Sequence, residues 1–246
     1  MLEVRGLGFA YQDQPVLFDG VSATVPDGHI LAVVGRNGAG KSTLFKLLNG
    51  ILKPDDGEVL VGGKSISGRK ISEIAAHIGT VFQSPEQQLF AGRVEEEVAF
   101  GPRQFGLPAN KISERVSDAL NRTWLLDQIA RHPLDLSAAE RRFLAIASVL
   151  AMRLPVLLLD EAQRGLDRVW TERLESILEA ERSAGKSIVM ICHDMDFVER
   201  NADTVLALGG RTPRQIPVPA FFSDTEVLAE VSVERPTPYR LREFMT

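Results

Sequence analysis

The stretch "HILAVVGRNGAGKSTLFKLLNG", His29–Gly50, places a glycine-rich loop between an apolar strand and a helix. Its centre, Gly35–Thr43, matches the pattern G-x-x-x-x-G-K-[ST] in the strand–loop–helix context that this pattern requires. Backbone N–H groups of such a loop face phosphate oxygens, and the N-terminus of the following helix favours negative charge. A plain glycine turn before a helix is the alternative, but the strand and the helix together favour a phosphate-binding loop.

The loop residues receive individual roles from this prediction. Lys41 is expected to reach the β- and γ-phosphates of ATP, and the Ser42 hydroxyl to ligate Mg²⁺. The nucleotide contacts predicted within the loop are Gly35, Asn37, Gly38, Gly40, Lys41, Ser42 and Thr43.

A second motif, "PVLLLDEA", Pro155–Ala162, runs from four apolar residues into two carboxylates. Open α/β sheets bind ligands at the carboxyl ends of their strands, which is where Asp160 and Glu161 are expected. Asp160 is predicted to hold the Mg²⁺ and Glu161 to polarise the attacking water. Asp160 could instead cap a helix, although the phosphate-binding loop upstream favours the metal role.

The pattern of apolar runs predicts an α/β fold with a doubly wound, parallel core sheet. Continuous apolar runs of this length are typical of strands buried on both faces. The expected core strands are His29–Val34, Pro155–Asp160, Ser187–Cys192 and Thr204–Leu208, with a helix at Thr171–Ser183. Near the N-terminus, "MLEVRGLGFAY", "VSATV" and "GEVLVGG" alternate in polarity and predict an antiparallel β subdomain.

The domain organisation follows from changes in these patterns. Residues 1–210 are expected to form one nucleotide-binding domain with an inserted helical subdomain at about 85–153. Residues 211–246 are proline-rich at first and then helical at "SDTEVLAEV", which predicts a short C-terminal extension.

Composition restricts the class of protein. The net charge is −5 and the pI about 5.5, which argues against a nucleic-acid partner because such surfaces are normally basic. The single cysteine, Cys192, predicts a reducing compartment. No apolar run approaches the length of a membrane span, and the N-terminus lacks the layout of a signal peptide. The chain is therefore expected in the cytosol.

Taken together, these motifs resemble those of ATP-binding cassette ATPases, a branch of the P-loop NTPases. The chain is most similar to the ATPases of energy-coupling-factor importers for vitamins and transition-metal ions, especially in "VEEEVAFGP", Val94–Pro102. The resemblance implies that Tyr11 stacks on adenine and that Gln83 senses Mg²⁺ and the membrane partner. It also implies that Asp167 belongs to the D-loop and that His193 contacts the γ-phosphate. Each residue alone has an ordinary structural interpretation, and only their common order carries the resemblance.

The family's signature motif, L-S-G-G-Q, corresponds here to Leu136–Glu140, "LSAAE". In the family two subunits pair head to tail, and this motif contacts the γ-phosphate held by the partner. Ser137 is retained, whereas Ala138 and Ala139 add methyl groups where the backbone must approach closely. Glu140 adds a negative charge, whose repulsion could reach about 4 kcal/mol at about 4 Å and an effective dielectric of about 20. The same residues form a capping box, so local helix formation is expected to improve.

Another departure lies beside Glu161, where the family's usual Pro-Thr is replaced by Ala162 and Gln163, followed by Arg164.

The resemblance implies a peripheral ATPase at the cytoplasmic face of the cell membrane, whose partners are a membrane-embedded coupling subunit and a substrate-binding subunit. The region Gln83–Phe100 is expected to receive them. The altered signature motif predicts a second, different ATPase subunit that supplies an intact motif, and a homodimer with two weak sites stays open. A catalytically weak regulatory subunit and a soluble, non-transport cassette ATPase are the alternative functions.

Overall fold

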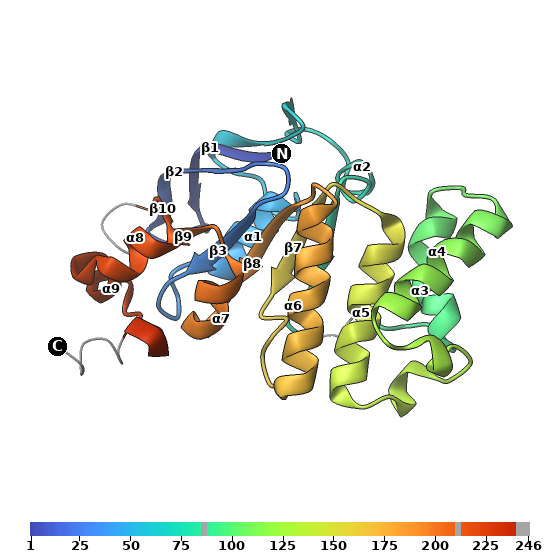
Figure 1. Ribbon diagram of the computed structural model, residues 1–246. Coiled ribbons are helices and arrows are strands. Elements are labelled where there is room, and N and C mark those ends of the chain that lie inside the picture. Colours follow the sequence, from blue (N-terminus) through green and yellow to red (C-terminus); the bar gives the residue numbers. More distant parts are fainter. Residues whose placement is uncertain (85–87, 210–212, 240–246) are drawn as a thin grey trace.

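The computed structural model describes residues 1–84, 88–209 and 213–239, which form two β-sheets flanked by helices (Figure 1). In the six-stranded sheet the order is β10-β9-β3-β8-β7-β6, and only β10 runs antiparallel to its neighbour among these strands. The strands are β3 (Ile30–Val34), β6 (Ile78–Val81), β7 (Val156–Asp160), β8 (Ser187–Ile191), β9 (Thr204–Ala207) and β10 (Arg214–Pro217). The four predicted core strands are confirmed, whereas β6 and β10 were not predicted.

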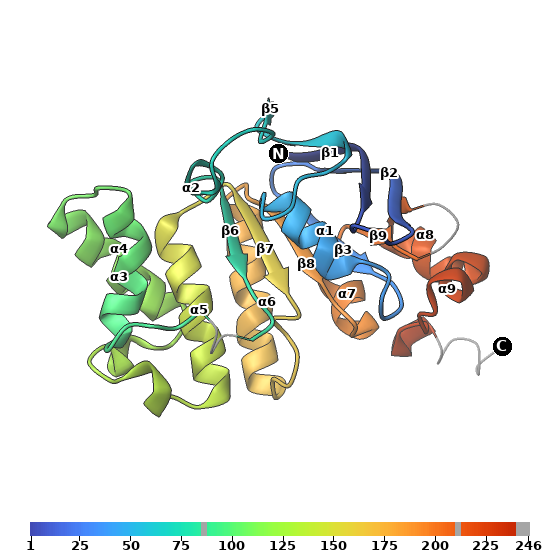
Figure 2. The same ribbon diagram turned by 180° about the vertical axis from the view of Figure 1, so that it is seen from behind.

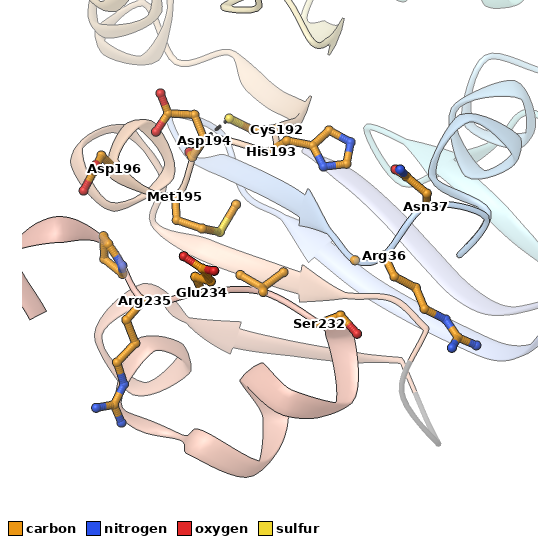
Figure 3. A pocket seen from close by; sticks show the side chains of 13 residues that line it. Arg36, Asn37, Cys192, His193, Asp194, Met195, Asp196, Ser232, Glu234 and Arg235 are labelled. Atoms are coloured by element: carbon orange, nitrogen blue, oxygen red, sulfur yellow. Dashed lines mark hydrogen bonds between the residues drawn. The ribbon is translucent and has the colours of Figure 1, made fainter. Parts of the chain in front are cut away.

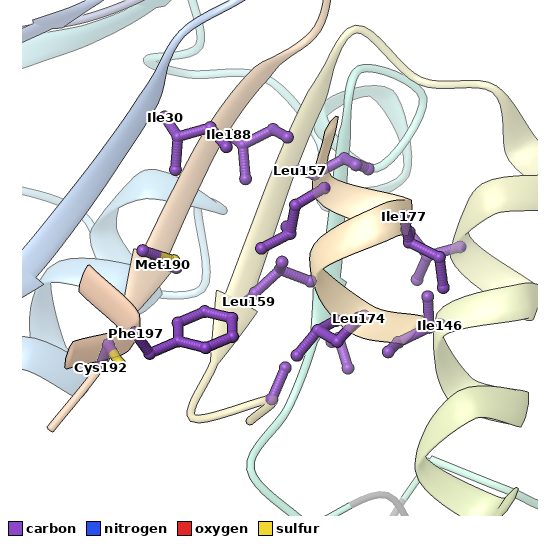
Figure 4. Close-up of a cluster of buried hydrophobic side chains, with 14 of the residues drawn as sticks. Ile30, Ile146, Leu157, Leu159, Leu174, Ile177, Ile188, Met190, Cys192 and Phe197 are labelled. Atoms are coloured by element: carbon purple, nitrogen blue, oxygen red, sulfur yellow. The ribbon is translucent and has the colours of Figure 1, made fainter. Parts of the chain in front are cut away.

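The parallel strands are mostly apolar, and β3 is apolar at every position, because alternate side chains enter two different cores. Along β3, Ala32 and Val34 belong to one cluster, and Leu31 and Val33 to the other. The first cluster includes side chains of α6 (Arg168–Ser183) and α7 (Met195–Asn201) (Figure 4). Leu44, Phe45, Leu47 and Leu48 of α1 (Lys41–Leu48) belong to the second cluster, and α1 lies on the opposite face of the sheet from α6 (Figure 2). Helices on both faces leave the strand ends as the accessible edge of the sheet.

The N-terminal region forms the predicted antiparallel sheet, with order β2-β1-β4-β5. Its strands are β1 (Leu2–Ala10), β2 (Val16–Val25), β4 (Asp56–Val61) and β5 (Lys64–Ser65), and the short helix α2 (Ile71–Ile74) follows. Buried residues of β1, β2 and β4 share a core cluster with α1. This sheet is thereby fixed beside the helix that begins at the phosphate-binding loop.

Three helices pack together at one end of the molecule: α3 (Val94–Gln104), α4 (Ala109–Arg122) and α5 (Ala138–Met152) (Figure 1). Two short 3₁₀ turns, Leu126–Gln128 and Pro133–Asp135, connect α4 to α5. We call α3, α4 and α5 the helical lobe. It corresponds to the predicted helical subdomain, whose first residues, 85–87, lie outside the described part of the chain.

The helical lobe is attached to α6 by aromatic and charged contacts. The Arg173 guanidinium lies 4.9 Å from the ring centroid of Trp124, just after α4, and 4.5 Å from that of Trp170 on α6. Arg122, the last residue of α4, pairs with the buried carboxylate of Glu181 on α6. Cation–π and buried ion-pair contacts of this kind need a defined geometry, so they orient the lobe relative to the sheet.

After β10 the chain forms α8 (Val218–Ser223) and α9 (Thr225–Val231). The predicted helix at Ser223–Val231 is confirmed as α9, and the proline-rich segment before it contains β10 and the start of α8. Pro217 and Pro219 stand at the start of α8, where a missing backbone N–H costs nothing. Residues 211–212 and 240–246 of the predicted extension lie outside the described part. Across residues 1–84, 88–209 and 213–239, every helix is too short or too polar to cross a membrane.

Candidate active site

The loop between β3 and α1 has the conformation that a phosphate-binding loop requires. Gly35, Gly38 and Gly40 all have positive φ angles, of 154°, 82° and 92°. A Cβ at Gly35 would lie 2.3 Å from the backbone oxygen of Leu208, so only glycine fits there. Gly40 caps α1 without any side-chain hydrogen bond. The first N–H groups of α1 therefore remain available for phosphate oxygens.

Lys41 is held inside this loop. Its Nζ donates to the backbone oxygens of Gly35, at 2.7 Å, and Arg36, at 3.2 Å, and the residue is only 8% exposed. Burial lowers the pKa of the Lys41 ammonium, while the carboxylates of Glu161 and Asp160 oppose that shift. The loop thus encloses a cation whose present partners are neutral carbonyl groups, which a phosphate could replace.

Asp160 ends β7, and Glu161 follows it. Burial, and then the neighbouring charge of Glu161, raise the pKa of the Asp160 carboxyl to about 6, with Lys41 acting in the opposite direction. A carboxylate whose charged form is disfavoured by the protein gains from a nearby divalent cation. Ser42, exposed on the first turn of α1, adds a hydroxyl oxygen, and Mg²⁺ prefers such oxygen ligands. The residues present therefore fit the predicted magnesium site.

The Glu161 carboxylate contacts side chains from two segments that are distant in sequence and from one nearby residue. Gln83 Nε2 and Arg164 Nη1 both donate to its Oε2, at 2.9 and 3.0 Å. His193 Nε2 lies 3.2 Å from its Oε1. Burial and the positive charge of Lys41 lower the pKa of the His193 imidazole, while Glu161 opposes that shift. The structure thus brings together three residues predicted separately, Gln83, Glu161 and His193.

A cavity of about 490 Å³ separates the phosphate-binding loop from the end of β8 and from the segment after α9 (Figure 3). Asn37 and His193 line this cavity together, and both also line a neighbouring cavity with Glu161 and Arg164. The predicted loop residue Asn37 therefore lines the same cavity as Glu161 and His193.

Tyr11, directly after β1, lies beside α1. Its hydroxyl is 3.0 Å from Thr43 Oγ1, and its ring meets Phe9 edge to face with centroids 4.9 Å apart. These contacts fix the orientation of a half-buried aromatic ring near the phosphate-binding loop. Thr43 is itself one of the predicted nucleotide contacts, and its link to Tyr11 was not apparent from the sequence.

The predicted capping box at the start of α5 is present in both directions. Ser137 N–H donates to Glu140 Oε2 at 2.7 Å, and Glu140 N–H donates to Ser137 Oγ at 3.3 Å. Hydrogen bonds from Ser137 lower the pKa of the Glu140 carboxyl. Figures 1 and 2 both show the start of α5 far from the loop between β3 and α1, with α6 and α7 between them. Within one chain, Ser137 is therefore not part of the Lys41 site.

Asp167 caps α6, where its Oδ1 accepts a hydrogen bond from Trp170 N–H at 2.9 Å. This is the structural role that an aspartate before a helix commonly has. The preceding residues, Gly165 and Leu166, line the cavity that contains Glu161.

Arg164 follows the altered motif in the sequence, and no functional role was predicted for it. The only local indication in the sequence is that Arg164 follows Glu161 by three residues. A turn between the two residues makes this spacing place them side by side. Arg164 N–H donates to the Glu161 carbonyl at 3.0 Å. This turn places the arginine side chain beside the Glu161 carboxylate.

Comparison with known proteins gives the family. Residues 18–164 match the model of the ABC transporter family. A putative ABC transporter ATP-binding protein of Pyrococcus furiosus is 39% identical over 99% of this chain and 90% of its own length. The energy-coupling factor transporter ATP-binding protein EcfA of Methanocaldococcus jannaschii is 36% identical over 100% of this chain and 89% of its own.

A solved structure agrees with these relatives. It is cbiO1 from Clostridium perfringens, described as part of the ABC transporter complex cbiONQ, and it superposes with a TM-score of 0.84 and 34% identity over 99% of this chain and 98% of its own. The likeness confirms the predicted cassette fold and the predicted family. The chain therefore belongs to the ABC transporter family and, within it, to the ATP-binding ATPase subunits of energy-coupling factor transporters.

Proposed function

We propose that this chain binds Mg-ATP at the loop between β3 and α1 and hydrolyses it to energise import of a vitamin or transition-metal ion. The observation that carries the proposal is the convergence of Gln83 and His193 on the carboxylate of Glu161, beside the buried Lys41. Relatives named as energy-coupling factor ATP-binding proteins support the transport role.

Each side chain of this site has a proposed task. Lys41 exchanges its carbonyl partners for the β- and γ-phosphates, and Tyr11 stacks on adenine. Asp160, Ser42 and Gln83 would hold magnesium, which would neutralise charge on the phosphate oxygens. Glu161 accepts a hydrogen bond from the attacking water and draws off its proton as the water attacks. His193 donates a ring N–H to the γ-phosphate.

Replacing Lys41 by Ala is expected to weaken ATP binding by at least about tenfold, because a charge-assisted hydrogen bond contributes about 1.5–3 kcal/mol. Isothermal titration of the full chain measures it. Lys46→Ala, which removes an exposed lysine from the same helix, is the matched control and should bind ATP as the wild type does. Equal affinities for the Lys41 and Lys46 variants would contradict the phosphate-loop assignment.

The surface that receives the membrane partner is proposed to be an apolar groove between β6, α3 and α5. It has a volume of about 680 Å³ and contains Phe90 and Phe100, which are 66% and 45% exposed. Their rings meet edge to face with centroids 4.8 Å apart. Exposed aromatic pairs in a groove are typical anchors for a partner segment. Within the region Gln83–Phe100 where the sequence predicts partner contacts, five described residues line the groove: Gln88, Leu89, Phe90, Glu97 and Phe100. The rest of the lining comes from other segments, including β6 and α5.

The double change Phe90→Ser and Phe100→Ser is expected to reduce the amount of co-purifying membrane protein by roughly tenfold or more, since a central aromatic anchor contributes about 2 kcal/mol. Quantitative mass spectrometry of the detergent-solubilised complex measures it. Leu126→Ser removes a leucine that is 40% exposed outside the groove and should have no effect. Undiminished co-purification with the double variant would move the docking surface elsewhere.

The assembly is proposed to contain a second ATPase with an intact signature motif, which completes the Lys41 site of this chain. A homodimer with two weakened sites is the other arrangement, and the subunit masses in the purified complex distinguish them. The assembly is proposed to lie at the cytoplasmic face of the cell membrane.

Residues 1–210 are proposed as the cassette domain, with the helical subdomain at about 85–153, and residues 211–246 as its extension.

A further inference from the structure

Among the described residues, three side chains contact the Glu161 carboxylate: Gln83, Arg164 and His193. In the proposed function Gln83 turns to magnesium and His193 to the γ-phosphate, so their hydrogen bonds to the carboxylate are exchanged. Arg164 has no proposed nucleotide contact, and its Nη1 lies 3.0 Å from Glu161 Oε2. It is the partner that remains.

We propose that Arg164 is a positioning residue, which holds Glu161 by Oε2 so that Oε1 faces the attacking water. The proposal rests on the proposed function, in which Glu161 is the catalytic carboxylate. His193 occupies Oε1 in this structure, so its departure frees the oxygen that the water needs. A catalytic base fixed by a third group is a common arrangement in hydrolases.

The backbone around Arg164 supports this role. Glu161 has a positive φ of 50°, which is uncommon for a residue other than glycine. Its N–H donates to the Ile191 carbonyl at 3.1 Å, and its carbonyl accepts from Arg164 N–H at 3.0 Å. These bonds tie the turn to the end of β8 and place the arginine beside the carboxylate.

A contact from α5 fixes the other side of the turn. Arg142 Nη1 donates to the backbone carbonyl of Arg164. Arg142 lies on the same helix that begins with the capping box of Ser137 and Glu140. The position of Arg164 therefore follows the position of α5 as well as that of the sheet.

Charge gives Arg164 a second reason to be present. Glu161 and Asp160 are adjacent carboxylates, and ATP brings further negative charge to the same edge of the sheet. A guanidinium stays protonated throughout the physiological range, whereas the Gln83 amide is neutral. Because the Arg164 side chain is 65% exposed, solvent screens part of this effect. Holding the carboxylate in place is consequently its principal role.

The test compares Arg164→Ala and Arg164→Lys in the assembled complex. Alanine is expected to lower kcat for ATP hydrolysis by about 10- to 100-fold, as loss of precise positioning does, with KM for ATP within about twofold. Lysine should recover part of the rate, because an ammonium can still bond one carboxylate oxygen. ATP affinity and the thermal midpoint of the isolated full chain should both match the wild type.

Arg168→Ala is the matched control. It removes a neighbouring arginine that pairs with Glu172 at 2.7 Å instead of Glu161, and it should leave kcat unchanged. An unchanged or increased kcat for Arg164→Ala would overturn the proposal, an increase meaning that the ion pair holds the resting enzyme inactive. Equal losses of kcat and ATP affinity would also overturn it, in favour of a merely structural role.

A comparison with Glu161→Gln separates this inference from the proposed function. If Glu161→Gln still hydrolyses ATP at the wild-type rate, the proposed catalytic role of Glu161 fails. If Glu161→Gln is silent and Arg164→Ala is as active as the wild type, only the role of Arg164 fails. If Glu161 is the catalytic carboxylate and Arg164 positions it, Arg164→Ala should cause no further loss of rate in the Glu161→Gln background.

Discussion

Glu161→Gln in the assembled transporter is expected to abolish ATP hydrolysis and to leave ATP binding intact. General-base assistance contributes roughly 10²- to 10⁴-fold in rate, so phosphate release should fall by at least about 100-fold. Glutamine keeps the size of the side chain and can still bond Gln83, but it cannot take a proton from water. Phosphate release per complex and equilibrium ATP binding are the two measurements.

Glu172→Gln, on the exposed face of α6, controls for the loss of one negative charge and should hydrolyse ATP normally. Turnover within about twofold of the wild type would mean that Glu161 is not the catalytic carboxylate, or that its composite site is already silent. Repeating the measurement with the partner ATPase inactivated distinguishes these two explanations.

The triple change Ala138→Gly, Ala139→Gly and Glu140→Gln is expected to separate stability from catalysis. Two glycines in the first turn of α5 should lower the free energy of unfolding by roughly 1–2 kcal/mol. Glutamine can replace glutamate in the capping box with Ser137. ATPase activity per complex should rise, because the backbone can approach the γ-phosphate and the opposing charge is gone.

The stability difference between the wild type and the triple variant should also depend on pH. The folded-state pKa of Glu140 lies below its ordinary value because of its bonds to Ser137. The stability that its carboxylate contributes is therefore present at neutral pH and is lost as the pH falls through the folded pKa. The difference in thermal midpoint between the wild type and the triple variant should shrink accordingly in acid.

Ala180→Gly, at an exposed position near the end of α6, is the control for destabilisation alone. It should lower the thermal midpoint without changing the ATPase rate. A triple variant that is less stable but no faster would show that Ala138, Ala139 and Glu140 do not limit turnover. The altered half-site would then be the wrong explanation for this motif.

The parts of the fold that sequence predicted are those in which local pattern and packing agree. Strand β3 is apolar at every position because both of its faces are buried, and a glycine loop follows it. The capping box at Ser137 depends only on residues three apart, so its geometry was predictable. By contrast, β6 has four residues, including Gly79 and Thr80, which is too short for a clear period. Strand β10 lies among prolines, and its edge position makes them acceptable.

The candidate site was predictable in its residues and not in its contacts. Gln83 and Glu161 are 78 positions apart and meet because β6 and β7 are neighbouring strands. Arg164 could be seen beside Glu161 in the sequence, but its orientation depends on the positive φ of Glu161. No propensity of glutamate favours that conformation, so tertiary packing determines it.

The contacts around Arg173 bear on the intrinsic tryptophan fluorescence of the chain. Both of its 2 tryptophans contact this arginine, Trp124 from the end of the helical lobe and Trp170 from α6. A displacement of the lobe relative to the sheet changes the distance between an indole and a positive charge, and with it the emission of the indole. We therefore expect the intrinsic fluorescence of the unlabelled protein to change if the lobe moves when ATP is added.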